Sequence, residues 1–508
     1  MHSIRLMALI LLICSAAACK NDFLETLPLT APSDKLFWKT DQDAITWINS
    51  AYQDLPGADD YVFNAMSDDA YTVTTANAVI ANGTYEPTSS IVASKWGYST
   101  IRQCLELLSR VDGIPNIDPV LSKRLKGEAQ FIIAMRYLEM TMLYRDVPLV
   151  DKVLSLPEAD IPKSDKAIVL KYALDQLEQA IPNLPARYPS AADNGRITKG
   201  AALALKARML LYNNQWAEAS VAAKAVMDLN VYQLHSTFNE VFQSNFNNQT
   251  KEVILARQYA KDLAVHTIQF SYGFYQIGGS GLSLPLPDLI NSYESKDGLP
   301  ITQSPLYDPL KPFDNRDPRF MQTFITPFET FAGVKYDPVN NKDAKTQAKT
   351  YLYYRKYIAD VANQQRSSWV NWIIFRYADV LLMYAEAKNE ASGPDETVYN
   401  TLDQIRTRAG MPKVDRSRYA TQETLRGLIR NERRVEMAGE GLRYYDILRW
   451  KIADKVLNKT VVSVAIPGVL PLQNIETRVF KPAKNYVWPI PQTAIDNATK
   501  LVQHPEWK

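Results

Sequence analysis

The sequence has few of the residues that build disulfides and metal sites. It contains three cysteines (Cys14, Cys19 and Cys104), too few for a disulfide framework, and four histidines that are scattered singly. We therefore expect neither a histidine-based metal site nor a bound cofactor. An excess of one charge is also missing, because 57 Lys and Arg face 55 Asp and Glu. This near-neutral balance argues against nucleic acid as a partner.

Long hydrophobic runs are missing too, and no segment beyond the N-terminal stretch is apolar enough to span a bilayer. The N-terminal apolar run, residues 6–13, is itself too short to do so. It follows Arg5, and small residues at positions 16–18 then lead to Cys19. This order is typical of a signal peptide over residues 1–18.

Small residues directly before a cysteine also resemble a bacterial lipobox. In that interpretation the thiol of Cys19 is acylated and becomes the first residue of the mature chain. The acyl chains would then be the only membrane anchor. The alternative is a plain secretory signal that is cut nearby.

Apolar residues recur at helical spacing through much of the chain. In the stretch 197–230, the small residues Ala207 and Ala219 lie twelve apart, which matches two packing positions of a tetratricopeptide unit. One such helix pair cannot bury its apolar face alone, so several pairs are expected to stack. The other helical segments predicted are 96–111, 121–144, 168–181 (stopped by Pro182), 376–390, 397–408 and 422–450.

The stretch Gln422–Trp450 has the most distinctive pattern. An amphipathic helix is expected first, then a break at Gly439 and Gly441, then a second helix that ends at Trp450. Acidic and basic residues alternate over positions 432–436, so neighbours three and four apart on the helix are expected to pair. The pattern therefore predicts a structural helical hairpin.

Two regions lack a sustained helical period. Residues 61–94 are expected to form long loops with a short strand. Residues 231–372 contain most of the turn-forming stretches rich in Gly, Pro and Asn. A short strand is expected there over residues 252–256. An irregular region as long as 231–372 is usually either functional or wrapped over a scaffold.

Several short stretches resemble motifs of the SusD/RagB family of surface lipoproteins. They are NERRVEMAGEGLRYYDILRW (431–450), SYESKDG (292–298), NRDPRF (315–320) and RYADVLLMYAEA (376–387). The resemblance implies a mainly helical α+β fold of tetratricopeptide-like helix pairs with long irregular loops and a few short strands. It divides the chain into a signal peptide (1–18), an N-terminal helical region (19–230), a loop-rich ligand-side region (231–372) and a C-terminal region (373–508).

The resemblance also implies a function. Such proteins are anchored in the outer membrane by lipid, face the cell exterior, and pass glycan oligomers to a SusC-like TonB-dependent transporter. Two alternatives stay open: a peptide-binding member of the same family, and a helical-repeat gating adaptor with no strong ligand site of its own.

Candidate ligand-binding residues follow from the chemistry of sugar recognition. A pyranose stacks on flat aromatic faces, and nearby amides, acids or arginines bind its hydroxyls. The alternatives are a solvated acidic loop at Asp68–Asp69 and a core position for Trp96. The irregular segments supply the candidates Asp69, Tyr71, Trp96, Tyr98, Trp369 and Asn371.

An enzyme is the remaining alternative. Glu432 and Glu436 share a helix face, as a carboxylate pair of a glycosidase would. Arginines surround them, however, and favour the charged form of both side chains. We therefore expect a structural network, no catalytic residue and no enzymatic activity.

Overall fold

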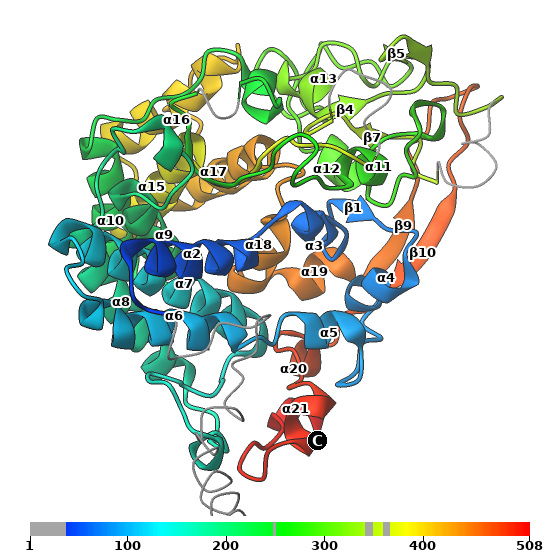
Figure 1. Ribbon diagram of the computed structural model, residues 1–508. Helices are drawn as coiled ribbons and strands as arrows, with labels where there is room; N and C mark the ends of the chain where they lie inside the picture. The colour runs from blue at the N-terminus through cyan, green and yellow to red at the C-terminus, as the bar shows by residue number, and fades with distance from the viewer. Residues whose placement is uncertain (1–36, 247–249, 341–348, 359–365) are drawn as a thin grey trace, which may run out of the picture.

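The computed structural model describes residues 37–246, 250–340, 349–358 and 366–508. The predicted signal peptide and Cys19 lie outside the described residues. Figure 1 shows an array of helices on one side of the molecule and a loop-rich part, with most of the strands, on the other. The two C-terminal helices lie together at one end.

Nineteen helices are seen in the described part of the chain, apart from short 3-10 turns. They are α2 (Asp41–Ala51), α3 (Val62–Ala65), α4 (Thr75–Ala81), α5 (Ser90–Ser94), α6 (Ser99–Arg110), α7 (Pro119–Tyr144), α8 (Lys166–Asn183), α9 (Lys199–Tyr212), α10 (Trp216–Asp228), α11 (Ile268–Tyr272), α12 (Pro287–Ile290), α13 (Arg319–Thr323), α15 (Tyr377–Ser392), α16 (Glu396–Arg408), α17 (Gln422–Glu436), α18 (Arg443–Arg449), α19 (Ala453–Leu457), α20 (Pro482–Asn485) and α21 (Gln492–Asp496).

The long helices form one continuous array. Helix α7 packs against α6 and α8, α9 against α8 and α10, and α10 against α15. Helix α15 in turn packs against α16 and α17. The prediction of a mainly helical fold with few short strands is confirmed. The helix pairs are compatible with tetratricopeptide-like packing.

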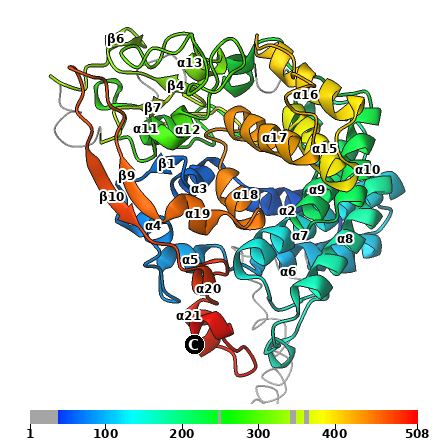
Figure 2. The same ribbon diagram turned by 180° about the vertical axis from the view of Figure 1, so that it is seen from behind.

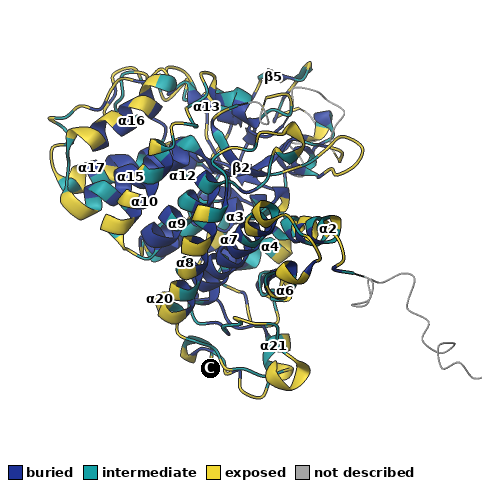
Figure 3. Cartoon of the chain, turned by 60° about the vertical axis from the view of Figure 1, so that its left-hand side comes forward, coloured by how far each residue is buried: buried dark blue, intermediate teal, exposed yellow. Residues whose placement is uncertain are grey.

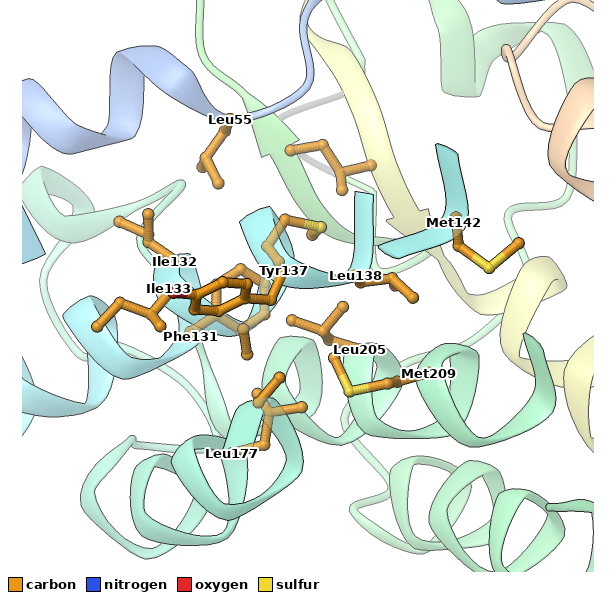
Figure 4. Close-up of a cluster of buried hydrophobic side chains, with 14 of the residues drawn as sticks. Leu55, Phe131, Ile132, Ile133, Tyr137, Leu138, Met142, Leu177, Leu205 and Met209 are labelled. Carbon is orange, nitrogen blue, oxygen red and sulfur yellow. The ribbon is translucent and has the colours of Figure 1, made fainter. Parts of the chain in front are cut away.

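Helix α7 is the centre of this array. Asp118 caps its N-terminus by accepting hydrogen bonds from the backbone N–H groups of Val120 and Leu121, and Pro119 occupies the first helical position. From Gly127 to Tyr144 every residue of this helix except Glu139 is buried, which is typical of a helix that neighbours surround. Figure 4 shows Leu55, Leu177 of α8 and Leu205 of α9 converging on α7. In Figure 3 the buried residues fill α7 and its surroundings, and exposed residues cover the outer helix faces.

The turns of the helix pairs follow the sequence pattern. Asn214 adopts a left-handed conformation (φ 60°) between α9 and α10, and Ala207 and Ala219 are both buried where these helices approach. Gly439 and Gly441 both have φ 78° between α17 and α18. Only glycine adopts this conformation without strain, which explains the break between the two helices.

The strands form five antiparallel pairs in the described residues. The pair of β2 with β8 joins residues far apart in sequence, with Leu255 opposite Phe375 and Arg257 opposite Trp372. Figure 2 shows β9 and β10 as an arm along the edge of the loop-rich part. The pairs are β1 (Ala70–Tyr71) with β3 (Leu284–Pro285), β2 (Val253–Arg257) with β8 (Trp372–Arg376), β4 (Phe324–Ile325) with β7 (Tyr353–Tyr354), β5 (Thr330–Phe331) with β6 (Val334–Lys335), and β9 (Lys459–Val462) with β10 (Asn474–Arg478).

Two expectations need correction. Residues 61–94 contain the predicted short strand, β1, but α3, α4 and α5 interrupt the predicted loops, and each is too short to show a sustained period in the sequence. The charges of α17 also do not pair along the helix. Arg433 binds Asp379 (2.6 Å) and Asp446 (2.8 Å), and Glu436 binds Arg376 (2.6 Å) from β8. Because this face of α17 is buried, its charges need partners, and those partners come from neighbouring elements.

The buried charges form a network that we call the arginine network. Its centre is Arg376, which is fully buried and whose guanidinium contacts three carboxylates. The network joins Glu252, directly before β2, to β8, α13, α16, α17 and the turn after α17, so it ties the loop-rich part to the helix array. Its members are Glu252, Arg319, Arg376, Arg408, Glu432, Glu436 and Glu440.

None of the helices in the described ranges combines the length and the hydrophobicity needed to cross a bilayer.

Candidate ligand-binding groove

A groove with two adjoining lobes runs along β2. One lobe has a volume of about 430 Å³ and is walled by the end of α2, by the turn at 192–196 and by residues 256–259. The other has a volume of about 360 Å³ and continues past the same turn to residues 186–188, 231–232 and 250–255. The lobes share Asn194, Gly195, Arg196, Ala256 and Gln258. We call this surface the β2 groove.

Four tyrosines line the β2 groove, and each hydroxyl is bound by the surrounding protein. The hydroxyl of Tyr52 accepts from the Ile197 N–H (3.0 Å), and that of Tyr188 donates to the Ile197 carbonyl (2.9 Å). The hydroxyl of Tyr232 lies 3.0 Å from the Thr198 side chain, and that of Tyr259 accepts from the Ala58 N–H (3.1 Å). The four rings are therefore fixed in place before any ligand arrives.

The tyrosines of the groove are neutral. Burial raises the pKa of Tyr52, Tyr188, Tyr232 and Tyr259 above the ordinary value of a tyrosine. All four side chains are only partly buried, so they combine a fixed orientation with an exposed part. Arginine guanidiniums lie 5.7–6.0 Å from the ring centroids of Tyr52, Tyr188 and Tyr259. The exposed part of each ring suits contact with the C–H surface of a sugar or with an apolar ligand.

Arg196 organises the polar part of the groove. Its guanidinium donates to Asn49 (2.9 Å), to Asp193 (2.9 Å) and to Glu128 (3.0 Å). Glu128 is fully buried behind the groove, and Asp193 lies on the same turn as Arg196. The guanidinium thereby compensates the negative charge of both carboxylates. It also orients the side chain of Asn49 on the exposed rim of the groove.

Gly195 lets the central turn approach β2. It has φ 89°, and a Cβ at this position would lie 2.5 Å from the side chain of Gln258. A larger residue would strain the backbone and displace Gln258 from the boundary between the lobes. Glycine at this position therefore keeps the two lobes connected.

Asn371, a sequence-predicted site residue, lies behind the groove. It is 1% exposed, its side-chain carbonyl accepts from the Tyr259 N–H (2.7 Å), and its amide donates to Gln258 (3.0 Å). Trp369, two residues earlier, is half-buried, and its ring centroid lies 5.6 Å from the ammonium of Lys261. Asn371 therefore positions two groove residues, and Trp369 lies nearby outside the lining of both lobes.

Asp69 and Tyr71 lie elsewhere, at β1. Asp69 is 2% exposed, and its carboxylate accepts from Arg434 at 2.7 Å. Asp68 likewise binds Arg443, so this acidic pair is buried and ion-paired rather than solvated. The hydroxyl of Tyr71 accepts from Lys349 at 3.2 Å.

Trp96 and Tyr98 lie in a third place, before α6. The ring of Trp96 packs edge-on against Tyr144, with the centroids 5.0 Å apart, and also against Tyr98. The hydroxyl of Tyr98 donates to the Pro148 carbonyl at 2.9 Å. The six sequence-predicted residues thus fall in three places, and a ligand-binding role for each stays a prediction.

The four groove tyrosines were missed by the sequence prediction. They come from positions 52, 188, 232 and 259, in segments with no shared motif. The abundance of tyrosine, 28 residues, was the only signal in the sequence that pointed to them. Among the described residues, no three His, Cys, Asp or Glu side chains come together as metal ligands.

The histidine beside Tyr259 makes the fold sensitive to acid. His266 accepts a hydrogen bond from the Ile268 N–H at Nδ1 (3.2 Å), and Nε2 lies 2.8 Å from the Val370 carbonyl, which fits a neutral ring that donates there. Burial lowers the pKa of His266 to about 4. Burial and the charges of Lys163 and Arg145 lower the pKa of His504 to about 4 as well.

We expect the free energy of unfolding to fall as the pH drops from 7 to 5. An unfolded histidine takes up a proton near pH 6.5, whereas the folded one stays neutral until about pH 4, so the unfolded state binds more protons in this window. Each histidine then contributes a loss of about 2 kcal/mol. Urea unfolding at several pH values measures how the free energy of unfolding changes with pH. His266→Gln should reduce this change between pH 7 and pH 5 by about half. An unchanged pH dependence in that variant would contradict the role given to His266.

Comparisons with known proteins agree with this architecture. The model of the SusD family matches residues 240–507, more than half of the chain. A SusD-like protein of Formosa agariphila is 26% identical over 481 residues, which cover 87% of this chain and 89% of that protein.

Solved structures show the same fold. A SusD-like carbohydrate-binding protein from Bacteroides fragilis superposes with a TM-score of 0.85 at 27% identity, covering 92% of this chain and all of that one. A laminarin-binding SusD-like protein superposes with a TM-score of 0.71 at 22% identity, covering 92% of this chain and 99% of that one. The chain belongs to the SusD family.

Proposed function

We propose that this chain binds glycan oligomers in the β2 groove. The observation that carries the proposal is the set of four tyrosine rings whose hydroxyls are held by the protein around two connected lobes. Family membership supports it, as does the fold shared with a SusD-like carbohydrate-binding protein of Bacteroides fragilis.

The chemistry of the groove suits sugars. Asn49, Gln53, Asn194 and Gln258 are exposed on its walls and offer amide donors and acceptors for hydroxyl groups. Rings that are already fixed lose little conformational entropy when a ligand stacks on them. Two lobes joined across one turn fit a ligand of several linked units better than a single small molecule.

Binding alone accounts for this arrangement. A glycosidase needs one carboxylic acid and one carboxylate that both reach the ligand. Asp193 in the groove wall and Glu128 behind it are both ion-paired with Arg196. The proposed function therefore includes no chemical step.

The proposal extends to the location of the protein. It would be attached to the outer membrane through acylated Cys19, face the cell exterior, and pass its glycan to a SusC-like TonB-dependent transporter. The lipobox-like order of residues 16–19 and the family membership support this part. Affinity purification of the tagged protein from outer membranes tests the partnership, and recovery without any TonB-dependent barrel would contradict it.

We expect Tyr259→Ala to weaken glycan binding about tenfold, since an aromatic contact of this kind contributes about 1 kcal/mol or more. The ring faces the first lobe, and its loss removes a stacking surface while the neighbouring walls remain. Isothermal titration of the protein with its oligosaccharide measures the effect.

A matched control is Tyr275→Ala, because Tyr275 is 45% exposed and lies outside the lining of both lobes. It should bind as the wild type does. If Trp369→Ala loses affinity and Tyr259→Ala does not, the site lies at Trp369 and the β2 groove is the wrong surface. If extended peptides bind the groove and glycans do not, the chain is a peptide-binding member of the family.

A further inference from the structure

A second pocket lies on another part of the helix array. It has a volume of about 230 Å³ and lies between the end of α7, the start of α8, the α9–α10 turn and the end of α18. It shares no lining residue with either lobe of the β2 groove. We call it the lysine pocket, after Lys166 and Lys451 in its wall.

The two lysines of this pocket lack acidic partners. Within the described residues, neither ammonium lies within 4.0 Å of a carboxylate, and that of Lys451 lies 4.4 Å from the ring centroid of Tyr486. Arg145, also in the wall, binds Asp146 (2.8 Å) and Glu506 (2.5 Å). Lys166 is half-buried and Lys451 is exposed, so the pocket presents two positive charges that no carboxylate of the described residues contacts directly.

The nearby acids are committed elsewhere. Asp146 accepts from the Lys166 backbone N–H (3.0 Å) and from Arg145, and the Tyr486 hydroxyl donates to Asp454 (2.6 Å). Arg449, the remaining cation of the wall, is held by Glu386 and Asp446. Asp146 offsets part of the charge of Lys166 at a distance, but no carboxylate of the described residues lies within 4.0 Å of either ammonium.

The cations of the pocket repel one another. Burial lowers the pKa of Lys166 to about 8, the charges of Lys451 and Arg145 add to this effect, and the charge of Asp146 opposes it. Burial and the charge of Arg145 also lower the pKa of Lys451. Like charges that face one cavity raise the free energy of the empty pocket, and a bound anion would remove that cost.

Helix dipoles do not explain the cluster. The C-termini of α7 and α18 carry partial negative charge, which favours Arg145 and Lys451. Lys166, however, is the first residue of the 18-residue helix α8, where the dipole disfavours a cation. A cation at a helix N-terminus is favourable when an anion binds at the same place.

The backbone at the pocket is also unusual. Arg145 (φ 64°), directly after α7, and Lys451 (φ 55°), two residues after the end of α18, both have a positive φ. Glycine would occupy these positions without strain, yet the chain places there two cations that face the same pocket.

We propose that the lysine pocket binds a tetrahedral oxyanion, a sulfate ester or a phosphate, between the ammonium groups of Lys166 and Lys451. The claim is independent of the proposed function, because it concerns a different surface. The oxyanion supplies the counterion that the wall lacks, and its oxygens accept hydrogen bonds from both ammonium groups.

Inorganic sulfate is the probe that tests the claim, because its charge stays constant between pH 6 and pH 9. At constant ionic strength, sulfate should raise the Tm of the wild type. The double variant Lys166→Gln/Lys451→Gln should lose at least about tenfold in sulfate affinity. The control Lys171→Gln, which removes an exposed lysine on α8 paired with Asp175, should bind like the wild type.

Two further readouts separate binding from a structural role. Without sulfate, Lys166→Gln should have a higher Tm than the wild type, because it removes repulsion and a cation that the dipole of α8 disfavours. In the wild type, sulfate binding should weaken above pH 8 as Lys166 loses its proton.

The source of the oxyanion is tested with a sulfated monosaccharide and its unsulfated parent. Binding of the sulfated sugar that depends on the lysines assigns the pocket to a sulfate ester, and binding of the inorganic ions alone assigns it to free sulfate or phosphate. Sulfate stabilisation that is equal in the double variant and the wild type, or absent from both, would overturn the proposal.

Discussion

Replacing Arg376 with methionine is expected to lower the free energy of unfolding by about 3–5 kcal/mol, the range for breaking a buried ion pair. Arg376 is 0% exposed and donates to Glu252 (2.9 Å), Glu436 (2.6 Å) and Glu440 (2.7 and 2.9 Å). Methionine fills much of the same volume but supplies no charge. The three carboxylates would then stay buried with one cation fewer.

The remaining partners cannot replace Arg376. Glu440 keeps Lys356 (3.0 Å), Glu252 keeps Arg408 (3.1 Å), and Glu436 keeps Arg319 (2.8 Å). Each of these cations already holds its own position, so none can move to the vacated centre. Denaturant unfolding followed by circular dichroism measures the loss.

The control for Arg376→Met is Lys171→Met. Lys171 pairs with Asp175 on the surface of α8, where both side chains are exposed. The loss should stay below about 0.5 kcal/mol, as for exposed pairs on one helix. If Arg376→Met were as stable as this control, the arginine network would not hold the loop-rich part to the helix array.

Replacing Cys19 with alanine is expected to release the protein from membranes almost completely. Each buried methylene of an acyl chain contributes about 0.8 kcal/mol, so losing two or more chains removes essentially all of the membrane affinity. The helices of the described residues offer no membrane span in place of the anchor. Fractionation without detergent, followed by immunoblotting, measures the distribution between membrane and soluble fractions.

Cys14→Ala is the matched control, because Cys14 lies in the same N-terminal segment, five residues earlier. It should leave the protein in the membrane fraction. If Cys19→Ala stayed there as well, even after a high-salt wash, the lipobox interpretation would be wrong and another attachment would be required.

Much of the helical fold could be predicted from the sequence, because long amphipathic helices repeat their pattern over many turns. The pairs α9–α10 and α15–α16 and the break at Gly439 and Gly441 follow directly from periodicity, small residues and glycine. The short helices at 62–65, 75–81 and 90–94 could not, since one or two turns do not show a period.

The sequence also did not predict which residues pair with the buried charges. The alternation at 432–436 shows that charges are present but not that β8 and α13 approach this helix face. Asn371 illustrates the same limit for the candidate site. All five residues of β8, which follows Asn371, are buried, so no alternation there marks which side chains reach a surface.

The β2 groove was hidden for a topological reason. Tyr52 and Tyr259 line the same lobe although they lie 207 positions apart in the sequence, because the pairing of β2 with β8 brings the loop-rich part beside α2. Only the folded chain shows that their hydroxyls are bound at 3.0 and 3.1 Å.

A library screen with the chain that starts at Lys20 tests the central claim most directly. Neutral and acidic oligosaccharides and extended peptides would be compared by their effect on the Tm of the wild type and of Tyr259→Ala. We predict that one class of oligosaccharide raises the Tm of the wild type and raises that of Tyr259→Ala much less. A chain that no glycan stabilises, or one that the variant leaves equally stabilised, would contradict glycan binding in the β2 groove.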